Sequence, residues 1–524
     1  MMKFPDFSPH LPNLKSILLS VISAILLVLA FPDFELWWMA WFALVPLLLA
    51  LESNSVGRSL VLGWIFGITF FLGTGWWLTF APITYAGFPA PLAYFLLLCV
   101  AVIAGFFPAA FAAGLSVCLS RFGIWAMFSA PFLWVAAEFA RYWITGNNWN
   151  AAGYSQAFGG PALKYASIGG ILLVSLLVVC VNALLAAFVL SRVWRPENLR
   201  FARSLLLALI GTLVVFGALE IAVRRPYSLD SRVAVARVIA IQPNVPMSGL
   251  TIEKWHALRE RHIQLAESTL KIEGNAKQPP TIVIFPESPM NFRYEEEPEF
   301  REWLKGFASR NNVSVLFNAA EPDHRMNKYF NSAVLVDTQG NKLAQYDKIY
   351  LMPFGEAVPF PLQSIVPALV GSFSYGNEYD LIPLGDAKAG VMICFETHFA
   401  DLSREFADRG ADVIIELTND GYLGPTPVLR QHLANAVFRA VEMNRPVLRV
   451  TNVGISAYID ERGRIIDPTD SYVEDTRVWN VFMSDGSQTF YSKYGDWIAW
   501  LSVLVSAVML GISYRWRLLP KLNN

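Results

Sequence analysis

One cysteine stands where an apolar run ends, in the stretch AGVMICFETHF at residues 389–399. Cys394 closes that run, and the carboxylate of Glu396 follows two positions later. A cysteine attacks an acyl carbon well only as its thiolate. Taken alone, Cys394 fits two interpretations, a reactive nucleophile or a small buried apolar side chain.

Further charged groups lie near predicted strand ends ahead of Cys394. Glu287 comes near the end of IVIFPES, and Lys348 and Glu356 lie in YDKIYLMPFGEAVPF. Carboxylates and amines at the ends of buried strands are costly unless they are paired or used. Each one alone also fits a surface or salt-bridged residue. Together with Cys394, they supply a base, a cation and a nucleophile.

This set of side chains predicts acyl transfer through a thioester. A carboxylate within hydrogen-bonding reach can take the thiol proton if partial burial raises the pKa of that carboxylate. Attack places negative charge on the acyl oxygen, which an ammonium and a backbone N–H stabilise. A second nucleophile then resolves the thioester.

The region that must position these groups, 226–492, has an α/β pattern. Its β-rich runs are nearly continuous apolar stretches, which is typical of strands buried on both faces. Helical spacing appears at 251–272, in EPEFREWLKGFASRNN and in TPVLRQHLANAVFRAVEMNR. The run NSAVLVDTQGNKLAQYDK, with its Gly-Asn turn, predicts an antiparallel hairpin. The sequence therefore predicts a helix–sheet–sheet–helix sandwich.

Outside this region the chain is strongly apolar. The 524 residues are 54% hydrophobic and 16% charged, with a formal net charge of -1. So little charge places much of the chain in lipid, and the near-neutral balance argues against a nucleic-acid partner. We expect a transmembrane bundle of seven spans in 1–225, a catalytic domain in 226–492, and an eighth span with a tail in 493–524.

Crossing the hydrocarbon core of a bilayer takes roughly 20 apolar residues. Eight segments are candidates, the second of them short and rich in aromatic residues: 14–31, 36–51, 58–80, 90–117, 123–142, 167–191, 202–222 and 493–514. The first also fits a signal peptide. However, LAFPDFELWW offers no small-residue cleavage site, and further spans follow directly.

Lysines and arginines predict the orientation of these spans. In an eight-span frame they gather at the N-terminus, in the loops after the second, fourth and sixth spans, and in the tail, with Arg141, Lys164, Arg224 and Arg225 as exceptions. Both termini are then expected in the cytoplasm and 226–492 outside. Cys99, Cys118 and Cys180 fall in predicted spans, so Cys394 is the lone cysteine of the outward domain.

One outward segment, EFARYWITGNNWNAAGYSQAFGG at 138–160, mixes aromatic residues with Asn and Gly. It fits an interfacial aromatic belt. It also fits a loop that lines a lipid-entry cleft, with Arg141 near phosphate head groups, because polar residues at membrane depth are costly and often functional.

The motifs FPES, YDKIYLMPFGEAVPF and CFE, in this order, resemble the Glu, Lys and Cys motifs of the nitrilase (carbon–nitrogen hydrolase) superfamily. The eight-span frame, with a domain inserted before the last span, resembles the apolipoprotein N-acyltransferase family. Further motifs extend the match over nearly the whole chain: GYSQ, IQPNVP, YFNSAVL, TNDGYLG and NRPVLRVTNVGISAYID. The resemblance implies a nitrilase-like α-β-β-α sandwich domain beside an eight-helix transmembrane bundle.

The resemblance also implies roles for single residues. Glu287 matches the general base, Lys348 the oxyanion-stabilising lysine and Cys394 the nucleophile. Glu356 matches a second essential carboxylate, which holds Lys348 or the acceptor amine. Asn331 and Glu396 match supporting positions, although Glu396 alone also fits a solvated charge at a strand end.

Candidate substrate contacts follow from the same resemblance. Phe395 stands where the family often has Tyr, and GYLG replaces an aromatic pair with Tyr422 and Leu423. Trp255 matches a tryptophan in the first helix of the domain, and Arg141 is the candidate contact for the lipid head group.

The function implied is a two-step transfer of a fatty acyl chain. The donor would be a phospholipid, by resemblance phosphatidylethanolamine, and the acceptor the α-amine of an N-terminal diacylglyceryl-cysteine on an apolipoprotein. The implied location is the bacterial inner membrane, with the catalytic domain on the periplasmic face. No metal or diffusible cofactor is expected, since the six histidines form no ligand cluster in the sequence.

Two other functions stay open at this point. A membrane-anchored amidase would hydrolyse the thioester with water and release a free fatty acid or ammonia. A non-enzymatic scaffold or transporter would use the α/β domain for binding alone, and Cys394→Ser would leave its function intact.

Overall fold

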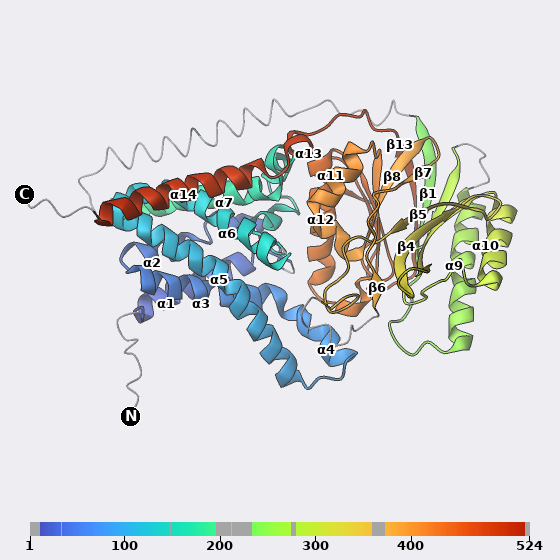
Figure 1. Ribbon diagram of the computed structural model, residues 1–524, viewed down its shortest axis with the longest axis horizontal. Coiled ribbons are helices and arrows are strands. Elements are labelled where there is room, and N and C mark those ends of the chain that lie inside the picture. The colour runs from blue at the N-terminus through green and yellow to red at the C-terminus, as the bar shows by residue number, and fades with distance from the viewer. Residues whose placement is uncertain are drawn as a thin grey trace, which may run out of the picture. The chain divides into compact units, whose positions relative to one another are not determined.

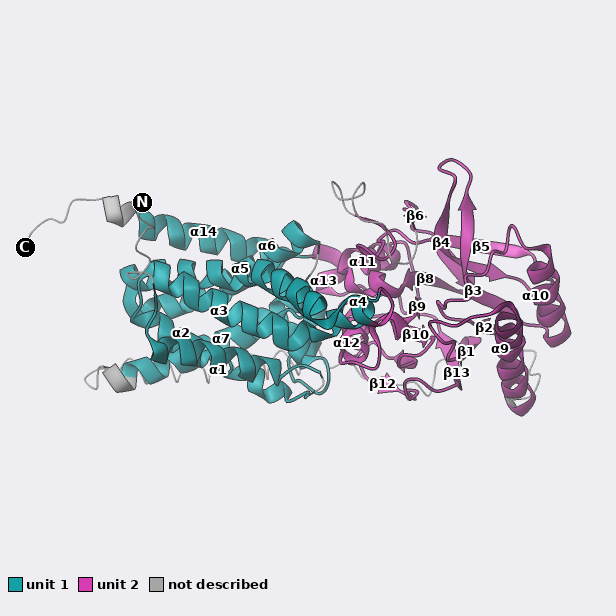
Figure 2. Cartoon of the chain, turned by 90° about the horizontal axis from the view of Figure 1, so that it is seen from below, with its two compact units in different colours: residues 1–83, 87–229, 496–524 teal, residues 84–86, 230–495 magenta. Residues whose placement is uncertain are grey.

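The structure, a computed structural model, separates the chain into two compact units (Figure 2). Unit 1 comprises residues 1–83, 87–229 and 496–524, and unit 2 comprises 84–86 and 230–495. The residues that the structure describes are 11–32, 34–146, 148–194, 211, 233–273, 279–358 and 372–518.

Unit 1 is helical wherever the structure describes an element. Short 3-10 turns join several of the helices, at Trp37–Trp41, Trp76–Thr79, Gly123–Ser129, Ala152–Gln156 and Leu163–Tyr165. Its α-helices are α1 (Leu14–Val28), α2 (Val45–Glu52), α3 (Val56–Gly75), α4 (Phe80–Thr84), α5 (Ala90–Phe122), α6 (Ala130–Thr145), α7 (Ala166–Trp194) and α14 (Trp497–Leu518).

The predicted eight-span bundle is not confirmed. Among the described residues, four helical segments are long and apolar enough to cross a bilayer: Val56–Thr84, Ala90–Thr145, Leu163–Ser191 and Trp497–Tyr514. The first two predicted spans form the shorter apolar helices Leu14–Val28 and Trp37–Glu52. An α-helix of 15 residues rises about 22 Å, so it is shorter than a hydrocarbon core of about 30 Å.

Of three other predicted spans, two are joined in one helical segment and one lies almost wholly outside the described residues. The predicted spans 90–117 and 123–142 lie within one continuous helical segment, Ala90–Thr145, in which the 3-10 turn Gly123–Ser129 separates α5 from α6. The predicted span 202–222 lies outside the described residues, apart from Gly211.

Small residues bring α3 and α5 close together, and the two helices pack along one another in the helical unit (Figure 1). A Cβ atom on Gly67 would come within 2.6 Å of the Gly105 Cα, and one on Gly63 within 2.5 Å of the Pro108 carbonyl. In lipid the hydrophobic effect does not drive helices together, because the lipid tails are as apolar as the side chains. Glycines that let two backbones approach closely then supply much of the van der Waals packing between helices.

Unit 2 contains two mixed sheets. The first has the order β13-β1-β2-β3-β4-β5, with β6 paired to β4. Its strands are β13 (Asp475–Phe482), β1 (Ala234–Gln242), β2 (Thr281–Ile284), β3 (Ser314–Asp323), β4 (Lys328–Val336), β5 (Lys342–Asp347) and β6 (Phe373–Ser374).

The second sheet has the order β12-β11-β10-β9-β8-β7. Its strands are β12 (Ile465–Ile466), β11 (Ala457–Ile459), β10 (Val447–Thr451), β9 (Val413–Thr418), β8 (Ala387–Ile393) and β7 (Leu381–Leu384). The neighbours β8, β9 and β10 run parallel, as do β1, β2 and β3 in the first sheet. Their buried runs of Val, Ile and Leu are the sequence pattern of strands covered on both faces.

Helices cover the outer faces of the two sheets (Figure 1). Helices α9 (Ile252–Glu273) and α10 (Pro298–Asn311) lie beside the first sheet, and α11 (Ala400–Asp408) and α12 (Val428–Met443) lie beside the second. Unit 2 ends with the short helix α13 (Phe490–Tyr494). The predicted helix–sheet–sheet–helix order is confirmed, and so is the antiparallel hairpin, which is formed by β4 and β5.

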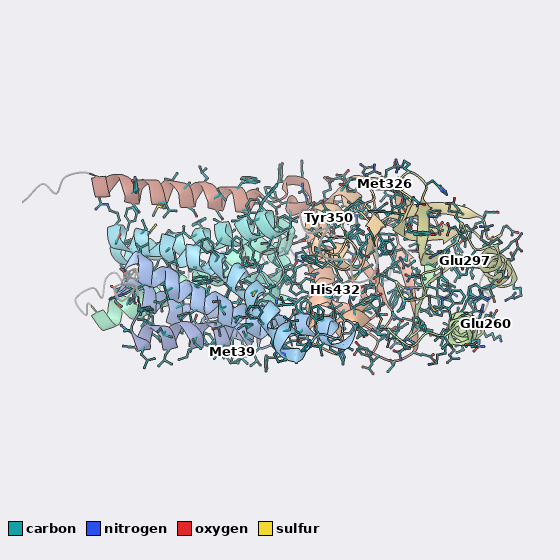
Figure 3. The ribbon with its side chains drawn as sticks, turned by 60° about the horizontal axis from the view of Figure 1, so that its bottom comes forward. Met39, Glu260, Glu297, Met326, Tyr350 and His432 are labelled. Carbon is teal, nitrogen blue, oxygen red and sulfur yellow. The ribbon has the colours of Figure 1, made fainter. Side chains whose placement is uncertain are left out.

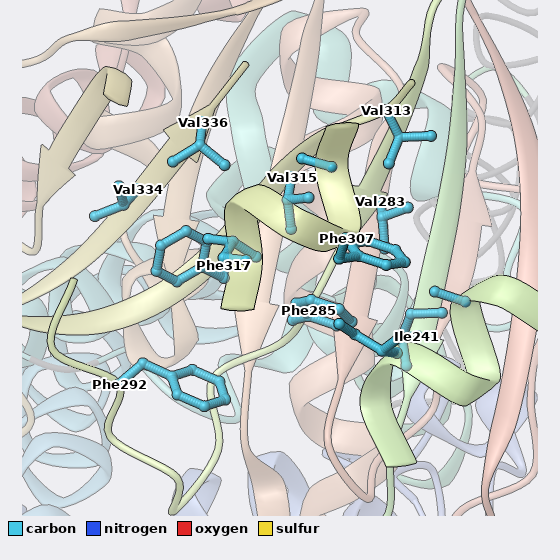
Figure 4. Close-up of a cluster of buried hydrophobic side chains, with 14 of the residues drawn as sticks. Ile241, Val283, Phe285, Phe292, Phe307, Val313, Val315, Phe317, Val334 and Val336 are labelled. Carbon is cyan, nitrogen blue, oxygen red and sulfur yellow. The ribbon is translucent and has the colours of Figure 1, made fainter. Parts of the chain in front are cut away.

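An apolar core fixes α9 and α10 on the first sheet (Figure 4). Aromatic rings fill it, with Phe292 stacked on Phe300 at 4.5 Å between ring centroids and Phe317 edge-on to Phe300 at 5.5 Å. Burying such side chains gives roughly 1.5–3 kcal/mol each. This packing holds the first sheet in place, and with it the ends of the strands that carry the candidate site.

Candidate active site

Cys394 lies at a sharp turn between a strand and a helix. Strand β8 ends at Ile393, and Cys394 is the first residue of the 3-10 helix η10 (Cys394–His398). The backbone of Cys394 has φ of 54°. A left-handed conformation at a non-glycine residue costs on the order of 1–3 kcal/mol and persists only where neighbours hold it. The turn places Cys394 at the carboxyl edge of the parallel strands, where ligands commonly bind in α/β sheets.

Glu287, Lys348 and Glu356 converge in unit 2. The Lys348 ammonium lies 2.9 Å from Glu356 and 3.8 Å from Glu287. The side chain of Lys348 is 1% exposed, and that of Glu287 is 13% exposed. A buried ammonium is tolerated only when it is paired, so the two carboxylates are what keep Lys348 charged in this position.

Asn331 on β4 joins the two carboxylates. Its amide nitrogen donates to Glu287 at 3.0 Å and to Glu356 at 2.7 Å. The carbonyl oxygen of the same amide accepts from Asn318 at 2.6 Å, which fixes the orientation of the group. Glu287 also accepts the backbone N–H of Asn419, at the end of β9, at 3.1 Å. Glu287 is thus held from both sheets.

The proton-binding groups influence one another. Burial raises the pKa of Glu287, against the Lys348 charge and a hydrogen bond with the Cys394 thiol, which both lower it. Burial and the negative charge of Glu287 raise the pKa of the Cys394 thiol well above its ordinary value. Burial would lower the pKa of Lys348, but Glu356 and Glu287 raise it beyond the ordinary value. Lys348 therefore stays charged, while the proton shared by Cys394 and Glu287 can move.

Glu396 is a buried connector, and the interpretation of a solvated strand-end charge is wrong because the residue is 0% exposed. One carboxylate oxygen accepts the Tyr346 hydroxyl at 2.8 Å and the backbone N–H groups of Ile349 and Tyr350 at 2.7 and 3.0 Å. The other accepts the Ile393 N–H at 2.8 Å. Glu396 thereby ties the Lys348 loop to the Cys394 turn. Burial raises its pKa to about 7.

Replacing Glu396 with glutamine should destabilise unit 2. The amide has one acceptor oxygen, and its NH₂ group would face an N–H donor that the carboxylate now satisfies. Leaving a buried donor without an acceptor costs about 1–3 kcal/mol. Chemical denaturation of the full chain in detergent measures the change. The matched control Glu405→Gln, which removes an exposed i,i+4 pair with Arg409, should stay within about 0.5 kcal/mol of the parent.

The other candidate residues of unit 2 are distributed unevenly. Burial raises the pKa of Tyr422, and the negative charges of Glu287, Cys394 and Glu356 raise it further. The Phe395 ring contacts His398 and Phe399. Trp255 sits on α9, where its indole N–H donates to the Met290 carbonyl at 3.1 Å. Its other ring contacts among the described residues are with His256, Arg259 and Phe292, and none is with Cys394.

Arg141 lies in unit 1, on α6. Its guanidinium donates to the Trp149 carbonyl at 2.9 Å and to the Asn148 side chain at 3.0 Å. On the same helix, Glu138 accepts the backbone N–H of Ala152 at 2.8 Å. These bonds hold the predicted outward segment against α6. A contact between Arg141 and a lipid phosphate stays a prediction.

Sequence reasoning missed a second charged cluster behind Cys394. It consists of four buried side chains: Glu416, Asp420, His432 and Arg449. Two of them lay in motifs already noted, Asp420 in TNDGYLG and Arg449 in NRPVLRVTNVGISAYID. A signal was present in β9 and β10, where Glu416 and Arg449 interrupt otherwise apolar runs at paired positions.

Within the described residues, no group of three or more His, Cys, Asp or Glu side chains is arranged to hold a metal ion. The described site contains one thiol, one ammonium and carboxylates. These groups can perform nucleophilic attack, proton transfer and oxyanion stabilisation.

Comparison with known families covers both units. Residues 23–184 match the family described as the apolipoprotein N-acyltransferase N-terminal domain. Residues 243–489 match the carbon-nitrogen hydrolase family. The two matches follow the order of the helical unit and the two-sheet unit in the chain.

Curated proteins match nearly the full length. The chain is 30% identical over 521 residues to an apolipoprotein N-acyltransferase of Geobacter metallireducens, covering 98% of each. It is 28% identical to that of Thermotoga maritima, covering 96% of this chain and 94% of the relative. It is 27% identical to that of Pasteurella multocida, covering 91% of each.

Solved structures match about half of the chain. Nit3 of Saccharomyces cerevisiae, a member of branch 10 of the nitrilase superfamily, matches with a TM-score of 0.36 and 19% identity, covering 49% of this chain and 93% of the other. An amidase from Nesterenkonia sp. matches with a TM-score of 0.37 and 17% identity, covering 49% of this chain and 95% of the other.

Proposed function

The chain belongs to the apolipoprotein N-acyltransferase family, and from this premise we propose that Glu287, Lys348 and Cys394 carry out its acyl transfer. The protein is an N-acyltransferase with apolar helices suited to a membrane. The observation that carries the assignment of residues is the convergence of the Lys348 ammonium on Glu287, at 3.8 Å, and on Glu356, at 2.9 Å, near Cys394, whose pKa the negative charge of Glu287 raises.

The first half-reaction loads the enzyme. Glu287 takes the thiol proton, and the Cys394 sulfur attacks the ester carbonyl of a phospholipid. The Lys348 ammonium and the Phe395 backbone N–H stabilise the oxyanion that forms. Collapse breaks the ester bond, and the leaving alkoxide of the lysophospholipid takes the proton from Glu287. The acyl chain remains on Cys394 as a thioester.

The second half-reaction transfers the chain to an amine. The neutral α-amine of a diacylglyceryl-cysteine at the N-terminus of an apolipoprotein attacks the thioester carbonyl. Glu287 accepts a proton from the attacking nitrogen, and the departing Cys394 sulfur regains it. Glu356 holds Lys348 at 2.9 Å during both half-reactions, so one oxyanion site serves both. The product is a triacylated lipoprotein.

A membrane location gives both substrates access to one site. Donor and acceptor are both lipid-anchored, so a site tethered at the bilayer raises their effective concentration and limits their orientations. We place the protein in the bacterial inner membrane, with unit 2 on the periplasmic face and both termini in the cytoplasm. Phosphatidylethanolamine is the expected donor.

Stepwise labelling of the full chain tests this proposal. Purified protein is mixed with a phospholipid carrying a labelled acyl chain and no acceptor, and one hydroxylamine-labile label per chain is expected. A diacylated lipopeptide with a free α-amine is then added, and the label should move to that amine. Release of labelled fatty acid instead would indicate an amidase, and no covalent label at all would contradict the thioester.

Replacing Glu287 with glutamine should slow formation of the acyl-enzyme about 10²- to 10⁴-fold, because the amide cannot take the thiol proton. Glu287 is a base only when ionised, and burial raises its pKa. The parent rate should therefore rise with pH through an apparent pKa above the ordinary value of a glutamate, which belongs to the coupled Glu287–Cys394 pair. Single-turnover labelling across a pH series measures this.

In the glutamine variant the acidic limb of that profile should disappear. The control is Glu474→Gln, which removes an exposed carboxylate paired with Arg261 in the same unit. It should keep both the rate and the profile of the parent. An acidic limb that persists in Glu287→Gln would show that another group is the base.

A further inference from the structure

His432 lies on α12 behind the Cys394 turn and is buried, with its side chain 4% exposed (Figure 3). One ring nitrogen, Nδ1, lies 2.7 Å from a carboxylate oxygen of Asp420. The other, Nε2, lies 3.1 Å from the backbone carbonyl of Cys394 and 3.2 Å from Glu416. A carbonyl oxygen only accepts hydrogen bonds, so Nε2 carries a proton and donates it to the Cys394 carbonyl, while Nδ1 faces Asp420 and also lies 3.4 Å from an Arg449 nitrogen.

Buried ion pairs hold the cluster around His432 together. Glu416 and Asp420 bring two negative charges, and both bond to Arg449, which brings one positive charge. The side chains of Glu416 and Arg449 are 0% exposed, and that of Asp420 is 1% exposed. An uncompensated buried charge is costly.

The contact from His432 Nε2 is with the peptide group between Cys394 and Phe395, whose N–H is the proposed donor to the oxyanion. The Cys394 carbonyl and the Phe395 N–H belong to the same peptide unit. A hydrogen bond to the carbonyl oxygen withdraws electron density from that unit and strengthens its N–H as a donor, since linked hydrogen bonds polarise one another. The Thr397 hydroxyl adds a second bond to the same carbonyl at 3.0 Å.

We propose that His432 is a positioning residue whose Nε2 donates to the Cys394 carbonyl and thereby strengthens the Phe395 N–H as a donor to the acyl oxyanion. The inference rests on the proposed function, because it concerns the oxyanion of the Cys394 acyl transfer. The Asp420 and Glu416 carboxylates and the Arg449 guanidinium hold the His432 ring in this position.

Two reactions of the same thiol separate this role from a structural one. Acyl transfer develops an oxyanion, whereas alkylation by iodoacetamide displaces iodide from a saturated carbon and develops none. A group that only holds the thiol in place affects both reactions. A group that acts on the oxyanion donor affects acylation alone.

The experiment uses the full chain in detergent with two substitutions. His432→Leu removes the ring nitrogens, and His432→Gln keeps an N–H donor at the end of a shorter-reaching, uncharged amide. Acyl-enzyme formation from labelled phospholipid should fall about 10- to 100-fold in the first and about 3- to 10-fold in the second, with little change in the donor concentration at half-saturation. Alkylation of Cys394, followed by mass spectrometry of its peptide, should stay within about threefold.

The matched control is His262→Leu. His262 is a second buried histidine of unit 2, bonded to the Leu258 carbonyl and packed on Phe285 and Phe292. Its loss should lower the denaturation midpoint and leave both rates per folded molecule unchanged. Equal losses of acylation and alkylation in the two His432 variants, or no loss in either, would overturn the inference.

The same experiment distinguishes failure of the proposed function. If the parent forms no acyl-enzyme, or Cys394→Ala still forms it, the proposed function fails whatever the His432 variants do. If the parent loads normally and the His432 variants load at the parent rate, only the inference on His432 fails.

Discussion

Cys394→Ala is expected to lower transfer to a lipopeptide amine by at least about 10⁴-fold and to abolish the hydroxylamine-labile acyl label. The thioester needs a sulfur, and removing the nucleophile leaves only binding and oxyanion stabilisation. Alanine has the same steric requirement as cysteine at φ of 54°, so the turn should persist. Labelling with a phospholipid acyl chain, with and without acceptor, measures both quantities.

Matched controls for Cys394→Ala exist in the same chain. Cys99, Cys118 and Cys180 are free cysteines of unit 1, and Cys99→Ala should leave labelling and transfer at the parent level. Cys394→Ser should be nearly as inactive as the alanine variant, because a serine hydroxyl loses its proton to a carboxylate far less readily than a thiol does. Transfer that persisted in Cys394→Ala would show that no thioester on this residue is required.

The two-sheet unit could be predicted from sequence because its signals are local. Near-continuous apolar runs such as VIIELT indicate a strand covered on both faces, and a Gly-Asn pair between two runs indicates a hairpin. Both patterns depend on a few consecutive residues. The order of strands within each sheet carries no such local signal, since β13 pairs with β1 across most of the unit.

The eight predicted membrane spans are not confirmed, in part because hydropathy measures composition and not helix length. The stretch 36–51 is apolar enough, but the structure divides it into the 3-10 turn Trp37–Trp41 and the eight-residue α2. Pro46, at the start of α2, lacks an N–H and fits only the first turn of a helix. The same reasoning would have lowered the weight given to this span.

The reactive groups of the candidate site could be predicted from the sequence. The buried charged residues that hold these groups in place could not. Glu287, Lys348 and Cys394 each follow a recognisable strand, so their convergence at strand ends could be expected. Glu396 receives donors from two separate segments, around Ile349 and Ile393, and the sequence contains no sign of that pairing. Buried charge clusters depend on which strands become neighbours, and only the fold decides this.

Lys348→Met is expected to damage both stability and catalysis, and the two effects can be separated. The methionine fills a similar volume but leaves Glu287 and Glu356 buried without their cation. Removing one partner of a buried ion pair typically costs about 3–5 kcal/mol. Losing a charged oxyanion donor should slow acyl-enzyme formation by about 10²- to 10³-fold. Denaturation and single-turnover labelling of the full chain measure the two effects.

The double variant Lys348→Met/Glu356→Gln decides between the roles of Lys348. The second substitution removes the carboxylate that lies 2.9 Å from the ammonium, so part of the lost stability should return. The return is partial because the amide cannot accept from both Asn331 and the Met352 N–H as the carboxylate does. The rate of acylation should not return, because nothing replaces the positive charge at the oxyanion. The exposed Lys342→Met serves as control and should change neither. Recovery of the rate together with stability would mean that Lys348 acts only by holding the carboxylates in place, and the oxyanion would then depend on backbone donors alone.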